Sequence, residues 1–183
     1  GQVDWRDIYR INGENIANGS RIVLYEDRTD DTTKTGNINV LAQLADNIVM
    51  NGGVNYIHSK SENFKNLLDL LGGNYYNNIN TFGVGDTRQN DLIDPNRTIY
   101  EGDKYGYNYN MISTKLDAFT QFKFNYKKVD FYLAQSFARN SYQREGLYKN
   151  GYYPTNSFGK SDKLIFDNFG FKGGITYKIT GNH

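Results

Sequence analysis

The chain of 183 residues can bury a core, and its 21 basic and 20 acidic residues almost balance, which leaves no positive surplus for nucleic-acid binding. Aromatic residues make up 15% of the chain and only two residues are proline, so the composition argues against disorder and favours strands joined by turns. Cysteine is absent, which excludes disulfides, thiolate metal sites and a cysteine nucleophile.

Residues 1–31 are predicted to form a long loop with a short helix near Trp5–Ile11. The chain opens Gly1-Gln2-Val3-Asp4 and shows neither the basic nor the apolar region of a signal peptide. No window of about 18 apolar residues occurs in the sequence. We therefore expect no transmembrane helix, and we expect a mature protein or an excised part of one.

Residues 32–58 are predicted to form a β-hairpin, because apolar residues recur at every second position. One apolar set consists of Ile38, Val40, Ala42 and Leu44. After Ala45-Asp46-Asn47 the alternation resumes with Ile48, Met50, Gly52, Val54 and Tyr56. Asp and Asn favour tight turns, so a very short connection is expected here.

Residues 59–104 are predicted to form a second long loop that contains a short amphipathic helix. The helix is indicated by apolar residues at positions i, i+3, i+4 and i+7, namely Phe64, Leu67, Leu68 and Leu71. Ser61 would begin this helix and Gly72-Gly73 would end it.

Residues 105–143 are predicted to form a second hairpin with its turn at Lys127-Lys128. A two-residue turn places Tyr126 opposite Val129. The apolar residues before the turn then share a face with those after it, which are Val129, Phe131, Leu133 and Phe137.

Residues 144–162 are expected to form a third long loop, and residues 163–179 the last strand, which would lead into a turn near 180–182. In this strand Phe169, Phe171, Ile175 and Tyr177 lie on one parity, whereas the other parity carries lysine, asparagine, threonine and glycine. About ten residues of sustained alternation is the length that a tilted transmembrane strand needs.

The predicted fold is all-β: an antiparallel meander of about five strands from a transmembrane β-barrel, with one or two short helices. Short turns alternate with long loops along the chain, as short periplasmic turns alternate with long extracellular loops in outer-membrane barrels. We expect the lipid-facing residues to include Phe131, Leu133, Phe169, Phe171, Ile175 and Tyr177.

Exposed aromatic residues of the predicted extracellular loops are candidates for ligand contact, because aromatic rings stack on sugars and on apolar ligands. The candidates are Trp5, Tyr75, Tyr76, Tyr148, Tyr152 and Tyr153, with Tyr9 in the same segments. The alternative is that these rings pack the loops against one another or belong to an interfacial girdle.

Acidic residues cluster on the first loop (Asp27, Asp30 and Asp31) and on the second (Asp86, Asp91 and Asp94). Oxygen-rich loops can bind calcium, but the spacing does not match an EF-hand, so solvated loop charge is the alternative. No other cofactor is expected.

The sequence contains no set of residues that predicts catalysis, so we expect no enzyme. His58 and His183 stand apart at a strand end and at the terminus, and both suit solvated surface positions. Nucleophile-elbow, zinc-protease and phosphate-loop motifs are absent. Gly53, Gly170 and Gly174 lie on the polar parity, where glycine could admit a close backbone neighbour or ease sheet curvature.

Several segments resemble the barrel region of Bacteroidota TonB-dependent outer-membrane receptors, a family that includes the SusC-like glycan transporters. The resembling segments are residues 3–9, Asn51-Gly52-Gly53-Val54-Asn55-Tyr56, residues 144–151, and Asn156-Ser157-Phe158-Gly159-Lys160-Ser161 running into residues 168–177. The family's plug, its TonB-contacting segment and its closing strand have no counterpart here, so the resemblance implies that residues 1–183 are part of a receptor barrel.

The resemblance implies a place in the cell outer membrane and a role in nutrient uptake of a glycan, siderophore, peptide or similar compound. The implied partners are outer-membrane lipid, the rest of the barrel and its plug, the TonB complex through the missing segments, and a surface lipoprotein. A different class of protein, a soluble β-sandwich that binds carbohydrate, would show the same strand alternation.

Overall fold

A computed structural model of the chain describes residues 2–14, 17 and 19–179. The chain divides into two compact units that interleave along the sequence. The first unit comprises residues 1–31, 60–111 and 143–162, and the second comprises residues 32–59, 112–142 and 163–183. Strands make up most of the regular secondary structure of the chain, which confirms the prediction of an all-β chain.

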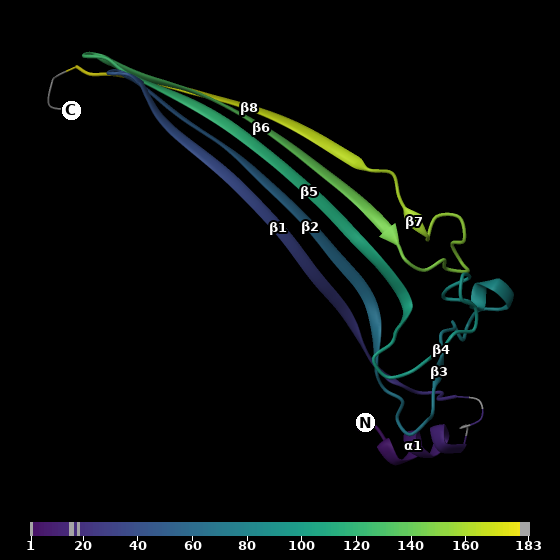
Figure 1. Cartoon of the computed structure of the whole chain (residues 1–183). Helices are drawn as coiled ribbons and strands as arrows, with labels where there is room; N and C mark the ends of the chain where they lie inside the picture. Colours follow the sequence, from purple (N-terminus) through teal and green to yellow (C-terminus); the bar gives the residue numbers. More distant parts are fainter. Residues whose placement is uncertain (1, 15–16, 18, 180–183) are drawn as a thin grey trace. The chain divides into compact units, whose positions relative to one another are not determined.

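Five long strands form the main sheet and lie side by side in the order β1-β2-β5-β6-β8 (Figure 1). They are β1 (Leu24–Ala45), β2 (Ile48–Asp69), β5 (Lys104–Asn125), β6 (Val129–Gly146) and β8 (Leu164–Tyr177). A two-residue strand, β7 (Gly159–Lys160), pairs with the last residues of β6. Within the described ranges this sheet stays open, with no pairing between β1 and β8.

Short and long connections alternate along the chain, as predicted. Residues 46–47 join β1 to β2, and residues 126–128 join β5 to β6. In the second of these turns the Tyr126 backbone N–H donates to the Val129 carbonyl at 3.0 Å, which is the predicted juxtaposition. Much longer segments join β2 to β5 and β6 to β8. The third predicted turn, at 180–182, lies outside the described residues.

The predicted amphipathic helix near Phe64–Leu71 is wrong, because these residues continue strand β2 to Asp69. Phe64 and Leu67 are both buried, yet residues three apart on a strand point to opposite faces. The Lys104 Nζ atom covers the Phe64 ring at 4.0 Å, while Leu67 packs with Ile99. Burial of Phe64 and Leu67 on opposite faces gives a spacing of three residues, which otherwise indicates a helix.

Other strand ends also extend into predicted loops. Strand β1 begins at Leu24, so Asp27, Asp30 and Asp31 lie on a strand and not on a loop. Strand β6 continues to Gly146. The short helix predicted near Trp5 is confirmed as α1 (Trp5–Glu14). No helix in the described ranges is both long and apolar enough to cross a membrane.

The first unit has a small core where the long connections meet the strand ends. Leu67, Leu70, Ile99 and Tyr105 are buried together. Ile99 belongs to β4 (Thr98–Ile99), which pairs antiparallel with β3 (Tyr76–Asn77). The same unit contains a 3-10 turn, η2 (Gly85–Arg88). The long connections are therefore ordered by their own packing, as functional surface loops frequently are.

Candidate functional site

The second unit carries a continuous apolar face built from alternate residues of five strands. A surface depression of about 490 Å³ is lined by eight of its side chains, which come from β1, β2, β5, β6 and β8. We define the apolar face as Ile38, Val40, Met50, Val54, Ala118, Phe124, Phe131, Leu133, Phe137, Phe169, Phe171, Ile175 and Tyr177.

The strand register explains why these residues share one face. Phe131 lies opposite Ile175, and Phe137 lies opposite Phe169 with ring centroids 5.1 Å apart. Phe124 stacks on Phe131 at 4.4 Å. Directly opposed residues of an antiparallel pair point to the same side of the sheet. The register thus brings together all residues predicted to face lipid: Phe131, Leu133, Phe169, Phe171, Ile175 and Tyr177.

Polar residues on this face satisfy each other. Gln135 Nε2 donates a hydrogen bond to Thr120 Oγ1 at 3.1 Å, between neighbouring strands. At the edge of the face, Arg139 forms two hydrogen bonds of 2.7 Å to the Asp167 carboxylate, its direct partner on β8. The apolar surface along β8 therefore begins after an ion pair and runs for nine residues, from Phe169 to Tyr177.

The opposite face of the second unit carries polar residues alongside apolar ones such as Leu41, Leu164 and Phe166. On β8 it carries Asn168, Lys172 and Thr176. Lys178 Nζ contacts the Asp130 carboxylate at 2.8 Å on the same side. The sheet therefore has one apolar face and one face of mixed, more polar character.

Glycines on the polar face lie beneath neighbouring side chains. A Cβ atom at Gly174 would come within 2.5 Å of the Tyr132 ring, and one at Gly170 within 2.6 Å of Ser136 Oγ. A Cβ atom at Gly53 would come within 2.8 Å of the Phe119 ring. These glycines therefore accommodate cross-strand side chains. This packing role differs from the two roles expected from the sequence, which were a close backbone neighbour and sheet curvature.

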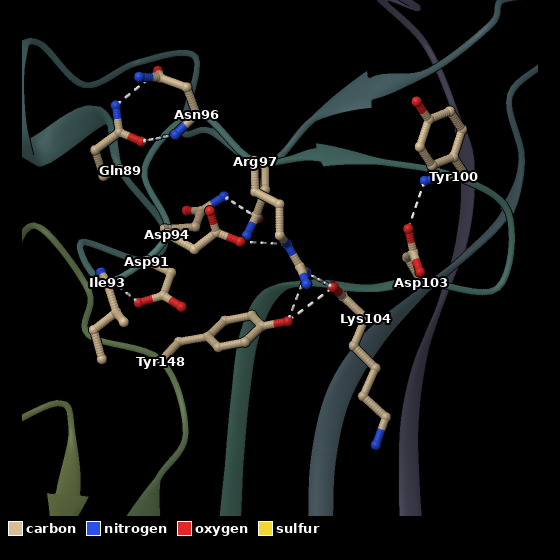
Figure 2. A network of polar contacts seen from close by, with 12 residues as sticks. Gln89, Asp91, Ile93, Asp94, Asn96, Arg97, Tyr100, Asp103, Lys104 and Tyr148 are labelled. Carbon is tan, nitrogen blue, oxygen red and sulfur yellow. Dashed lines mark hydrogen bonds and ion pairs between the residues drawn. The ribbon is translucent and has the colours of Figure 1, made fainter.

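Tyr148 joins the two long connections of the first unit, as Figure 2 shows. Its hydroxyl donates to the Lys104 carbonyl at 2.8 Å and accepts a hydrogen bond from Arg97 Nη2 at 2.9 Å. The Arg97 guanidinium also contacts that carbonyl, and its Nε atom lies 4.0 Å from the Asp94 carboxylate. Burial raises the pKa of Tyr148, so its hydroxyl stays protonated as a donor.

The predicted ligand-contact aromatics fall into two groups. Tyr75 donates its hydroxyl hydrogen to the Ala17 carbonyl at 3.0 Å, and Tyr76 packs edge-to-face on Tyr105 at 5.7 Å. With Tyr148, they hold the loops in place. The residues that remain exposed are Trp5, Tyr152 and Tyr153. The structure does not bring all these candidates into one site.

Four of the six acidic residues considered as calcium ligands make other contacts, namely Asp27, Asp30, Asp91 and Asp94. Asp27 accepts a hydrogen bond from the Tyr107 hydroxyl at 2.9 Å, and burial, followed by this bond, raises the pKa of Tyr107 to about 12. Asp91 accepts from the Lys149 backbone N–H, and Asp30 pairs with Arg28. Across the described ranges no three His, Cys, Asp or Glu residues gather as metal ligands.

The two histidines and the unpredicted residues of the apolar face complete the comparison of predicted and observed positions. His58 is half-buried, with Nδ1 at 3.0 Å from Thr114 Oγ1, whereas His183 lies outside the described residues. Seven residues of the apolar face were missing from the predicted lipid-facing set, namely Ile38, Val40, Met50, Val54, Phe124, Phe137 and Ala118. Their parity in the hairpin patterns would have identified all of them except Ala118.

Comparison with protein families, with curated proteins and with solved structures finds no match to this chain.

Proposed function

We propose that the chain is part of an outer-membrane β-barrel of the TonB-dependent transporter type, which captures a nutrient through its loops and admits it through the barrel. The observation that carries the proposal is the exposed apolar face of the second unit. Phe169, Phe171 and Ile175 are 72%, 79% and 76% exposed. Soluble monomers rarely expose a contiguous apolar patch of this kind.

The exposure of these apolar side chains to water is costly in free energy, so an apolar neighbour is expected to cover them. Burying one large apolar side chain contributes about 1.5–3 kcal/mol, so Leu133, Phe169, Phe171 and Ile175 together account for roughly 6–12 kcal/mol. That amount is comparable with the whole stability of a typical domain, about 5–15 kcal/mol. Lipid would supply this neighbour, because the nine-residue stretch of β8 matches the roughly 9–11 residues of a transmembrane strand.

Membership of the TonB-dependent family rests on the sequence resemblance and on the alternation of short turns with ordered long connections. In this proposal the polar face lines the lumen, and energy comes from a partner complex that contacts other segments of the receptor. A soluble carbohydrate-binding sandwich would need a second sheet over the apolar face. The other sheet among the described residues consists of β3 and β4, with two residues in each strand.

Detergent dependence of the purified chain tests the proposal. We expect the chain to stay in solution only with detergent or lipid, because the apolar face otherwise drives association. Substitution of Phe169, Phe171 and Ile175 by serine should reduce this dependence, whereas substitution of Asn168, Lys172 and Thr176 by serine on the opposite face should not. A wild-type chain that is monomeric in plain buffer would contradict the proposal and favour the sandwich.

A further inference from the structure

Two adjoining cavities in the first unit are lined by basic residues and by no acidic residue. Their volumes are about 550 and 570 Å³, within the range of roughly 300–1,000 Å³ for small-molecule sites. Both are lined by Arg21, Tyr76 and Ile79. Arg88 lines one of them and Lys65 the other, and neither has an acidic residue in its lining.

This lining does not reflect the composition of the unit, in which 16 acidic residues outnumber 12 basic ones. Four other basic residues of the unit pair with a carboxylate, namely Arg10, Arg28, Arg97 and Lys104. Within the described part of the chain, Arg21, Lys65 and Arg88 have no carboxylate partner. Their charges are therefore available to an anion.

The Lys65 ammonium group lies against two aromatic rings. Its Nζ atom lies 4.4 Å from the ring centroid of Tyr25 and 6.0 Å from that of Tyr107. The aliphatic part of Lys65 passes over Gly106, which adopts a φ of +71°, and a Cβ atom there would lie 3.2 Å from Lys65 Cδ. Glycine readily adopts this backbone conformation. Because Gly106 has no Cβ atom, it also leaves room for the aliphatic part of Lys65.

Carboxamides contribute to the remaining polar lining, together with Thr81, which lines both cavities. Asn80, Asn90 and Asn150 line the cavity that contains Lys65. Asn78 is 1% exposed, and its Oδ1 atom accepts hydrogen bonds from Asn90 Nδ2 at 3.1 Å and from the Gly106 backbone N–H at 2.8 Å. This buried asparagine fixes the wall of the cavity. Carboxamides both donate and accept, which suits a ligand rich in hydroxyl groups.

We propose that these cavities bind an acidic sugar, a polyhydroxylated ring that carries a negative charge. The cations would pair with the charged group, the asparagines with hydroxyls, and the tyrosine rings with the apolar face of the sugar. The inference goes beyond the proposed transport function and does not depend on it, since binding at the first unit needs no membrane insertion.

Calorimetric titration of the full chain in detergent with trigalacturonate tests the proposal, with neutral galactotriose as the matched probe. We expect trigalacturonate to bind at least about tenfold more tightly than galactotriose, because a hydrogen bond to a charged group is worth more than a neutral one. The affinity should fall about tenfold or more in Lys65→Met, which keeps the aliphatic stem over Gly106, and also in Arg88→Gln at an exposed position.

Lys60→Met serves as the control, since Lys60 is exposed on the same strand and lies outside both cavities. Its affinity for trigalacturonate should equal that of the wild type. The proposal is overturned if the wild type does not bind trigalacturonate, if both sugars bind equally, or if Lys65→Met and Arg88→Gln leave the affinity unchanged. A failure here leaves the detergent dependence of the apolar face untouched, so the two proposals fail separately.

Discussion

The side chain of Asn12 is fully buried and makes five hydrogen bonds to the backbone of the first unit. Its Nδ2 atom donates to the carbonyls of Ile22, Leu70 and Leu71 at 2.7–3.0 Å. Its Oδ1 atom accepts from the backbone N–H groups of Arg21 and Ile22 at 3.0 and 3.2 Å. One side chain thus links α1 to the start of β1 and to the segment that follows β2.

Asn12→Asp should destabilise the first unit by about 3 kcal/mol or more, because a buried carboxylate cannot donate to three carbonyls and leaves a charge unpaired. Hydrogen exchange at the amides of Arg21 and Ile22 measures the effect and should accelerate. Asn74→Asp, at an exposed position, is the control. Unchanged protection in Asn12→Asp would show that these bonds contribute little.

The role of Asn12 could not be predicted from the sequence. Its partners lie between 9 and 59 residues away, and no local pattern indicates which asparagine among many will be buried. The aromatic candidates present the same difficulty. Tyr148 and Tyr153 are five residues apart in one predicted loop, yet the first anchors two segments and the second is exposed.

At the scale of strands, parity was the informative signal. The alternation around Lys127-Lys128 and along residues 169–177 correctly predicted which side chains share a face, because a strand has only two faces and a short turn fixes the register. Strand ends were predicted poorly. Phe64 and Leu67 are buried on opposite faces of β2, so the apolar residues there show no alternation, and the pattern resembled that of a helix.

The packing of Tyr132 over Gly174 gives an element-scale prediction. Gly174→Ala should cost about 1 kcal/mol of unfolding free energy, since the new methyl group displaces the ring. Gly173→Ala, where the nearest atoms lie at 3.4 Å, should be close to neutral. Denaturant titration in detergent measures both.

In a Tyr132→Ala background the cost of Gly174→Ala should disappear, because the ring that it displaces is gone. A double-mutant cycle then yields a coupling of about 1 kcal/mol between the two positions. The same cost in both backgrounds would mean that Gly174 is required for its backbone conformation and not for the space it leaves.

At the scale of the whole chain, the two units differ in how charged and apolar residues are distributed over their surfaces. The second unit has few acidic residues and divides into an apolar and a polar face, whereas the first is rich in acidic residues but has cavities lined by bases. Sequence patterning predicted the division of the second unit. It could not predict the cavities, because their walls come from residues as distant as Arg21 and Asn150.

The central claim, that lipid covers the apolar face, is tested most directly by tryptophan fluorescence in bilayers of brominated lipid. Trp5 is the one tryptophan of the sequence, so Trp5→Phe provides a background without tryptophan fluorescence. Phe171→Trp then probes the apolar face, and Tyr132→Trp probes the polar face on the neighbouring strand. The proposal predicts strong quenching by bromine for Phe171→Trp, and for Tyr132→Trp weak quenching by bromine with ready quenching by aqueous iodide. Equal bromine quenching at both positions, or a Phe171→Trp probe shielded from both quenchers as in a dry protein core, would contradict it.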